Sequence, residues 1–83
     1  MEYKITYKKS VIKDLKKIDK TDLKRLITKI EKELNKKPES YPALKGEFAG
    51  LRKLRVGTYR IIYAILNKEV LILRIGHRKE VYL

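Results

Sequence analysis

The chain has 83 residues, a length that allows one domain with a core large enough to fold alone. Its 22 Lys and Arg outnumber its 10 Asp and Glu, and the formal charge of +12 is split evenly between residues 1–40 and 41–83. The absence of Cys excludes disulfides and thiolate metal sites, and a single His excludes a His-clustered zinc centre. A positive field over the whole domain favours a polyanionic partner, nucleic acid or an acidic protein, over a merely soluble lysine-rich surface.

The first half of the sequence predicts a strand and two helices. Residues 2–8 alternate apolar and polar side chains, which is typical of a half-buried strand with Tyr3, Ile5 and Tyr7 on one face. Ser10 is a candidate N-cap for a first helix, and Thr21 is a candidate N-cap for a second. Apolar residues recur at helical spacing in both: Val11, Ile12, Leu15 and Ile18, then Leu23, Leu26, Ile27, Ile30 and Leu34. Pro38 cannot continue the second helix, so the two form a helical hairpin.

The second half predicts two β-hairpins. The first joins residues 51–56 to residues 59–63 through Gly57 and Thr58, the pattern of a type II′ turn with glycine at positive φ. This register sets Arg55 opposite Arg60 and puts Lys53 on the same face as both. The second hairpin joins residues 59–66 to residues 70–75 around Asn67.

The element order β-α-α-β-β-β predicts a single α+β domain over residues 1–83. We expect the helical hairpin to pack on one face of an antiparallel four-stranded sheet and the other face to remain partly open. The longest apolar run, residues 61–66, is far too short to span a bilayer. No stretch at the N-terminus has the apolar pattern of a signal peptide, so we expect a soluble cytoplasmic protein without membrane contact.

The opposed arginines predict a surface that binds an anion. Like charges directly opposite destabilise a sheet, and no acidic residue lies between Glu47 and Glu69 to relieve the repulsion locally. The four glycines do not form a phosphate-binding loop, and the carboxylates show no set that would converge on one pocket. We therefore expect no metal site and no small-molecule cofactor.

Basic and aromatic residues remain as candidates for chemistry that needs no metal. They are Lys53, Arg55, Arg60, His77, Arg78 and Tyr82. RNA is cut without a metal when its own 2′-OH attacks the adjacent phosphate. Arginines suit the binding of phosphate oxygens, and a lysine crowded by arginines has its charged form disfavoured and becomes a better base. Taken singly, each residue also has a structural explanation, as a solvated strand position or a packing aromatic.

Three segments carry a family resemblance: Leu44-Lys45-Gly46, residues 51–63 with the pattern L-R-x-L-R-V-G-x-Y-R-I-I-Y, and residues 76–82 with the pattern G-H-R-x-x-V-Y. They closely resemble RelE-type toxins of the RelE/ParE toxin–antitoxin superfamily. The resemblance implies an mRNA endonuclease that acts in the ribosomal A site and a cognate, RelB-like antitoxin that neutralises it. The leading strand and the helical pair also fit this family.

The resemblance also assigns roles to individual residues. Lys53 resembles the general base, Arg60 the arginine that stabilises the transition-state phosphate, and Arg78 an arginine for phosphate contact or leaving-group protonation. Tyr82 resembles a tyrosine that stacks on or activates the substrate. A wider set is expected to bind RNA: Lys45, Arg52, Arg55 and His77. Strand parity puts Arg52 on the opposite face, and it puts His77 rather than Arg78 on the basic face unless Gly76 forms a bulge.

Two other functions remain open at this point. One is a non-catalytic inhibitor resembling ParE, which acts by binding DNA gyrase. The other is a basic RNA-binding domain without cleavage, whose binding would depend steeply on salt.

Overall fold

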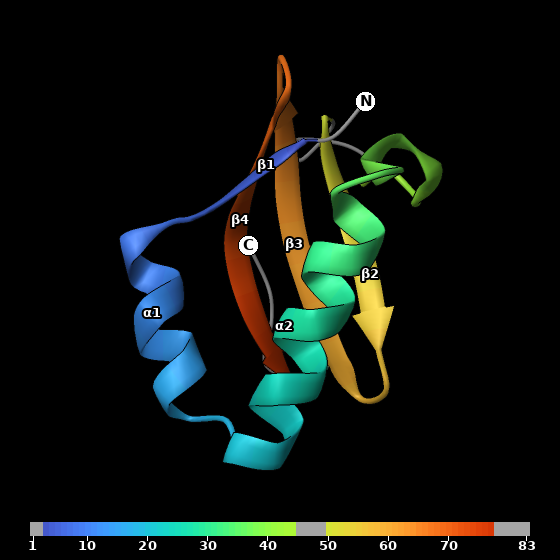
Figure 1. Cartoon of the computed structure of the whole chain (residues 1–83). Helices are drawn as coiled ribbons and strands as arrows, with labels where there is room; N and C mark the ends of the chain where they lie inside the picture. Colours follow the sequence, from blue (N-terminus) through green and yellow to red (C-terminus); the bar gives the residue numbers. More distant parts are fainter. Residues whose placement is uncertain (1–2, 45–49, 78–83) are drawn as a thin grey trace.

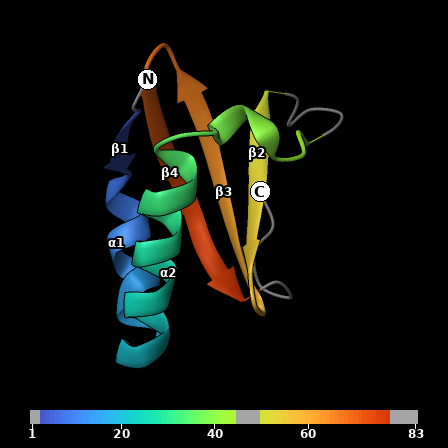
Figure 2. The same cartoon turned by 45° about the vertical axis from the view of Figure 1, so that its right-hand side comes forward.

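The computed structural model describes residues 3–44 and 50–77. This part of the chain contains two α-helices, one short 3-10 helix and four strands, in the predicted order. The elements are β1 (Lys4–Tyr7), α1 (Lys9–Lys16), α2 (Lys20–Leu34), η1 (Pro38–Ser40), β2 (Leu51–Val56), β3 (Tyr59–Leu66) and β4 (Glu69–His77). Both helices cover one face of the sheet, as predicted, and leave its other face outside the helical layer (Figures 1 and 2). No described helix is long and apolar enough to cross a bilayer.

The sheet has the strand order β1-β4-β3-β2 and is mixed. The pairs β2–β3 and β3–β4 are antiparallel, as predicted, but β1 lies parallel to β4, with Lys4–Tyr7 alongside Glu69–Ile72. The prediction of a fully antiparallel sheet is therefore wrong for the pair β1–β4. The helical hairpin returns the chain to the end where β1 begins, so β2 and, two strands later, β4 run in the direction of β1 (Figure 1).

The core fills the space between the helices and the sheet. Its fully buried helix residues include Val11, Leu26, Ile30 and Leu34, and they pack against side chains of β3 and β4 such as Ile61 and Ile72. The predicted strand face of Tyr3, Ile5 and Tyr7 also packs against this core. Ile12 is the exception in the predicted helical stripes, because its side chain is 51% exposed.

Both predicted helix caps are wrong by two positions. The N-cap of α1 is Lys8, which makes no side-chain cap bond, so Ser10 lies inside the first turn. The N-cap of α2 is Asp19, whose carboxylate accepts a hydrogen bond from the Thr21 N–H at 3.2 Å. An aspartate outcompetes the nearby threonine here because its charge also interacts favourably with the helix dipole.

The first hairpin has the predicted register throughout, including Arg55 opposite Arg60 and Lys53 opposite Ile62. Gly57 has φ +60, and Thr58 is not among the residues with positive φ, as a type II′ turn requires. The β3–β4 pairing shifts by one residue after Ile62, which pairs with Arg74, while Tyr63 pairs with Ile72. The bulged residue is therefore Leu73, which reverses the parity of the rest of β4.

The segment from Pro38 to Ala43 is fixed against the sheet by two side chains. The buried Tyr63 hydroxyl donates to the Pro38 carbonyl at 2.6 Å, and Arg52 Nη1 donates to the carbonyls of Tyr41 at 2.7 Å and Glu39 at 3.1 Å. An isolated bridge between Ala43 and Arg52 continues the contact. These bonds bring residues 41–43 to the outer edge of β2.

Candidate functional site

Three of the predicted cations share the sheet face that lies away from the helices. Lys53 and Arg55 come from β2 and Arg60 from β3, and the alternation of the hairpin puts all three on the side opposite the core residues Leu54 and Ile61. Arg55 is exposed, whereas Lys53 and Arg60 are partly covered. The three positive charges therefore lie close together in the half of the first hairpin that ends at its turn.

These cations have no neutralising partner among the described residues. Neither ion pair found in residues 3–44 and 50–77 includes Lys53, Arg55 or Arg60. The Nε atom of Arg60 is buried and donates to no acceptor within the same ranges. A buried donor without an acceptor costs free energy, and an anion that reached this atom would remove that cost.

The surroundings of Lys53 disfavour its charged form. Desolvation is the largest cause of a lowered pKa for this amine, and the positive charges of Arg55 and Arg60 lower the pKa further. A lowered pKa is the effect expected from the sequence, where the arginines were the predicted cause; the partial desolvation of Lys53 was not predicted. A lysine in these surroundings is better suited to accept a proton than an isolated surface lysine is.

A depression at the outer edge of β2 lies next to these cations. It is lined by Tyr41, Pro42, Lys53, Leu54 and Arg55. The Pro42 carbonyl accepts a hydrogen bond from the Lys53 N–H at 3.1 Å, which fixes the loop against the strand. The depression brings an aromatic ring within the same site as two cations, an arrangement suited to a nucleotide with a base and a phosphate.

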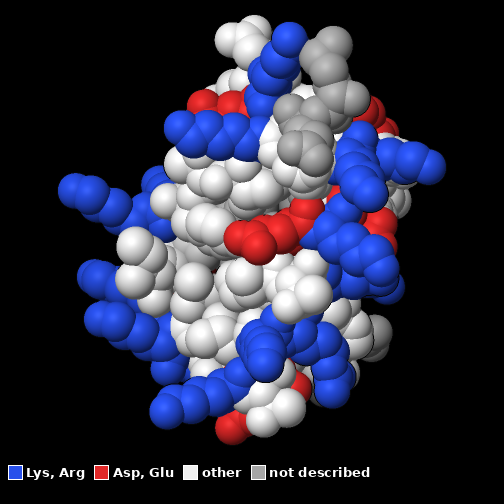
Figure 3. All heavy atoms as spheres, viewed as in Figure 1, with Lys and Arg blue, Asp and Glu red and all other residues white. Residues whose placement is uncertain are grey.

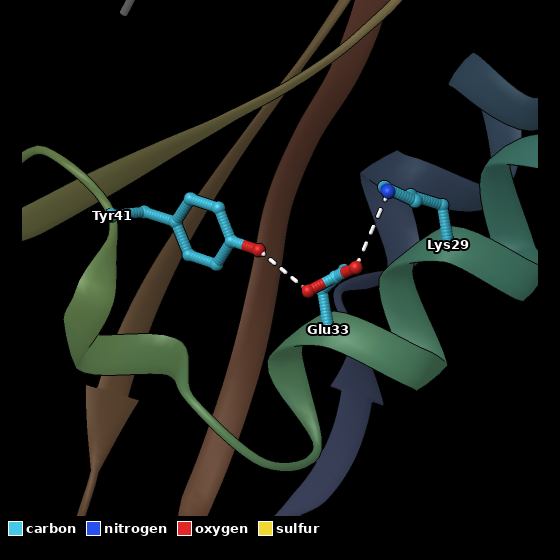
Figure 4. A network of polar contacts seen from close by, with 3 residues as sticks. All are labelled: Lys29, Glu33 and Tyr41. Atoms are coloured by element: carbon cyan, nitrogen blue, oxygen red, sulfur yellow. Dashed lines mark hydrogen bonds and ion pairs between the residues drawn. The ribbon is translucent and has the colours of Figure 1, made fainter.

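A network that begins on α2 orients Tyr41. Its hydroxyl donates to Glu33 Oε2 at 2.9 Å, and Glu33 Oε1 pairs with the Lys29 ammonium at 3.2 Å (Figure 4). The hydrogen bond from Tyr41 is the largest cause of a lowered pKa for Glu33, followed by the bond from Lys29. This network was not predicted, because residues 33 and 41 lie on different elements.

Arg52 lies apart from the three cations. As strand parity predicted, it is on the helix side of β2, and its guanidinium is engaged by the Glu39 and Tyr41 carbonyls. Its present contacts hold the loop that lines the depression.

His77 also lies on the helix side, contrary to the expectation from parity. It pairs with Tyr59, and the two rings meet edge to face with centroids 6.1 Å apart. The Tyr59 hydroxyl in turn donates to Asp22 on α2 at 3.2 Å. The bulge at Leu73, three residues before the expected position at Gly76, is the physical reason.

Because of the same bulge, Gly76 lies on the same face of the sheet as Arg60. The two residues pair directly, so β4 contributes no side chain beside the Arg60 guanidinium. Arg74, which was not among the predicted site residues, pairs with Ile62, and its Nε lies 3.4 Å from Asp14 Oδ2 on α1. No spacing rule distinguishes Arg74, because its position depends on the bulge.

Three predicted site residues, Lys45, Arg78 and Tyr82, lie outside the described residues. Within the described ranges, no three His, Cys, Asp or Glu side chains are grouped so that they could hold a metal ion. The described part of the site is thus a cluster of one lysine and two arginines beside a depression with an aromatic wall.

Comparisons with known proteins give one family and several similar structures. The model of the family described as the ParE toxin of the type II toxin–antitoxin system parDE matches residues 5–82. A chain of the RelBE2 toxin–antitoxin complex from Mycobacterium tuberculosis is 29% identical, with a TM-score of 0.82, over 94% of this chain and 100% of that chain. A chain of the archaeal RelE–RelB complex from Pyrococcus horikoshii is 28% identical, with a TM-score of 0.74, over 98% of this chain and 100% of that chain. The comparison with curated protein sequences gives no match.

Proposed function

Because the chain belongs to the ParE toxin family of type II toxin–antitoxin systems, within the RelE/ParE superfamily, we propose that it arrests translation by cutting messenger RNA on the ribosome. The cleavage would need no metal. The observation that carries this proposal is the convergence of Lys53, Arg55 and Arg60 on one open sheet face.

The arrangement of these residues supports phosphate chemistry over simple surface charge. Arg55 and Arg60 oppose each other without a carboxylate in an ion pair with either among the described residues, and the Arg60 Nε has no acceptor there. A structural hairpin gains nothing from this repulsion, whereas a bound phosphate would be held by both guanidinium groups. Lys53, with its lowered pKa, lies beside them.

The reaction follows from these roles. Lys53 accepts the proton of the 2′-OH as its oxygen attacks the adjacent phosphorus in line. Arg60 stabilises the additional negative charge of the pentavalent phosphorane, with Arg55 as a contact to the RNA backbone. The bond from phosphorus to the 5′-oxygen then breaks and this oxygen takes up a proton, which leaves a 2′,3′-cyclic phosphate and a 5′-OH.

The remaining roles come from the family resemblance. Arg78 would contact the phosphate or protonate the leaving oxygen, Tyr82 would stack on a base, and Lys45 would bind the RNA backbone. The bulge at Leu73 puts His77 on the helix side, which leaves Arg78 as the candidate for this role.

A cognate antitoxin is the expected protein partner. The similar chains from Mycobacterium tuberculosis and Pyrococcus horikoshii come from complexes described as toxin–antitoxin and RelE–RelB. We expect a RelB-like antitoxin to neutralise this chain, and we expect the chain to act in the cytoplasm, where messenger RNA and ribosomes are found.

The test is induced expression followed by mapping of the 5′ ends of cellular messages, with and without the gene for the antitoxin. We expect new 5′ ends within translated regions, and none with the variant Lys53→Ala/Arg60→Ala/Tyr82→Ala. The matched variant Lys8→Ala/Lys68→Ala also removes two cations, both exposed, and should cut normally. Equal cutting by the first variant, with its fold verified by circular dichroism, would overturn the site assignment.

The family model itself favours a second candidate, a ParE-like inhibitor that binds DNA gyrase without catalysis. A DNA-supercoiling assay with purified gyrase separates the two functions. Inhibition of supercoiling without new message ends would support this second candidate. RNA binding that weakens steeply with salt, with no cleavage on ribosomes and no effect on gyrase, would instead indicate a basic RNA-binding domain.

A further inference from the structure

Positive charge alone does not locate a nucleotide site in this domain. Figure 3, which views the helical layer, shows that most charged side chains on that face are also Lys or Arg. A site for a single base is located instead by a flat aromatic surface beside groups that can hydrogen-bond the edge of the base. The depression at the outer edge of β2 combines both features, and it shares Lys53 with the candidate site.

The aromatic wall of this depression is the ring of Tyr41, which is held in place at two points. Its hydroxyl donates to Glu33 Oε2 at 2.9 Å (Figure 4), and the carbonyl of the next residue, Pro42, accepts from the Lys53 N–H at 3.1 Å. Burial is the largest cause of a raised pKa for Tyr41, followed by the bond to Glu33, so the phenol stays protonated and continues to donate. A ring that is already oriented loses less conformational entropy when a base stacks on it.

The outer edge of β2 is paired with the preceding loop only as far as Lys53. The pairing consists of the bridge between Ala43 and Arg52 and the bond from the Lys53 N–H to Pro42. Proline has no N–H with which to return a bond to the Lys53 carbonyl. Alternation along the strand directs the Arg55 N–H to the same outer edge. Within residues 3–44 and 50–77, this carbonyl and this N–H therefore have no backbone partner on the outer side of β2.

This short free edge suits a base better than it suits a peptide strand. A peptide that adds to a sheet needs a row of unpaired main-chain groups, but the loop occupies the edge up to Lys53 and β2 ends at Val56. One acceptor and one donor next to each other are left, and the edge of one base can use both. Polar and apolar atoms contribute about equally to the surface of the depression, which matches a base with an apolar face and a polar edge.

We infer that Tyr41 determines which base is accepted next to the phosphate that is cut. The base stacks on the Tyr41 ring, while its edge donates to the Lys53 carbonyl and accepts from the Arg55 N–H. Stacking strength sets the preference among bases on such a surface, so a purine, with its larger ring system, gains most. This subsite rests on the proposed function, because it requires RNA to be held for cleavage on the adjoining sheet face.

The first measurement is the rate at which ribosome-bound messages are cut when they differ only in the bases that flank the cut. The unmodified chain should favour a purine at one flanking position. Tyr41→Leu removes the ring but keeps an apolar side chain, so it should lower the rate on the purine message about tenfold and remove most of the preference. Tyr41→Phe keeps the ring and should retain the preference. The control Tyr7→Leu changes a half-buried tyrosine of β1, at the opposite edge of the sheet, and should also retain it.

Two results of this measurement would overturn the inference while the proposed nuclease stands. One is an unchanged base preference in Tyr41→Leu. The other is an equal loss of rate on purine and pyrimidine messages, because that would assign Tyr41 a structural role only. Lost binding of a co-expressed antitoxin by Tyr41→Leu, with its base preference intact, would also overturn the inference and assign the depression to a protein.

A second measurement does not depend on cleavage. The probe is the 2′-O-methyl dinucleotide ApA, which lacks the attacking hydroxyl and stays intact during an NMR titration. The Tyr41 ring protons should move upfield as a base stacks on them, and the Arg55 amide proton should move downfield as it donates a hydrogen bond. Shifts confined to other basic residues would overturn the inference. If the expected shifts occur but messages are not cut, base binding by Tyr41 is supported and only the proposed nuclease fails.

Discussion

Arg55 of β2 lies directly across the ladder from Arg60 of β3, at a position where opposite charges or aromatic pairs would stabilise a sheet. Replacing Arg55 by Thr removes the repulsion and introduces a residue with high β propensity. We expect the free energy of unfolding to rise by about 0.5 kcal/mol, and the melting temperature to rise by about 2–4 °C for a domain of this size. Thermal unfolding followed by circular dichroism measures both.

The same variant should bind RNA more weakly and arrest translation less, so stability and function would change in opposite directions. A loss of stability in Arg55→Thr would contradict the interpretation of the arginine pair as a functional feature held at a structural cost.

Arg52 should respond in the opposite way, although it is only three residues away on the same strand. Its guanidinium donates to the carbonyls of Glu39 and Tyr41, and methionine at this position would keep the length of the side chain but not the hydrogen bonds. We expect Arg52→Met to lower the free energy of unfolding by about 1–2 kcal/mol. Urea unfolding curves of the two variants, measured together, provide the comparison, and a neutral Arg52→Met would show that the loop at residues 39–41 is held by other contacts.

The first hairpin shows how much of the fold local sequence determines. Its turn residues, register and faces follow from Gly57 and from alternation alone, because a two-residue turn fixes which residues are opposed. The clustering of Lys53, Arg55 and Arg60 on one face was therefore predictable from the sequence alone.

Features that depend on distant contacts were not predictable in this way. The parallel pairing of β1 with β4 joins residues about 65 positions apart in sequence, and alternation in β1 says nothing of the direction of its neighbour. The bulge at Leu73 carries no glycine or proline signal, yet it moves His77 to the helix side and Gly76 beside Arg60. The hydrogen bonds of Arg52 and Tyr41 likewise depend on how a loop returns to the sheet.

The pKa of Lys53 can be tested directly by NMR titration of its side chain. Desolvation and the charges of Arg55 and Arg60 lower it in the folded chain. Arg55→Thr removes one of the two charges, so the pKa should rise, yet it should stay below the ordinary lysine value because desolvation remains. Lys8→Gln, which removes a distant cation, should leave the titration of Lys53 unchanged, and an equal response to both variants would indicate long-range charge instead of local contact.

The direction of the pKa shift also fixes the sign of its effect on stability. A lysine with a lower pKa in the folded chain holds fewer protons there than in the unfolded chain. Its contribution to the free energy of unfolding therefore rises as pH increases from the folded pKa to the unfolded pKa. If Lys53 is the general base, the cleavage rate should also rise with pH up to the pKa of Lys53 in the folded chain and then level off. Arg55→Thr, which raises this pKa, should shift the rising part of the pH–rate profile to higher pH.

The contact between Glu33 and Tyr41 predicts the behaviour of a carboxylate on α2. The Tyr41 hydrogen bond is the largest cause of the lowered pKa of Glu33, and the Lys29 bond comes second. We expect the pKa of Glu33 to rise in Tyr41→Phe by more than it does in Lys29→Gln, as measured by NMR of the Glu33 carboxyl carbon. The reverse order would show that the ammonium ion, and not the phenol, dominates at this carboxylate.

The exposed end of β4 gives the last prediction. β1 pairs with β4 only as far as Ile72, so the backbone beyond that point has no strand of residues 3–44 and 50–77 on its outer side. In place of a neighbouring strand, Asp14 of α1 contacts this edge. Its Oδ2 accepts a hydrogen bond from the Ile75 N–H at 3.2 Å and lies 3.4 Å from Arg74 Nε. An unpaired strand edge is a template for association with other chains, and charged side chains commonly protect such edges.

Asp14→Ala should therefore have two effects that a single measurement would not separate. Loss of the acceptor should lower the free energy of unfolding by about 1–2 kcal/mol, and the freed edge should increase self-association. Asp14→Asn keeps an acceptor for the Ile75 N–H but not the charge, so it should retain most of the stability. Urea unfolding and sedimentation velocity of the two variants measure these effects. A monomeric and fully stable Asp14→Ala would show that the edge is protected by its twist alone.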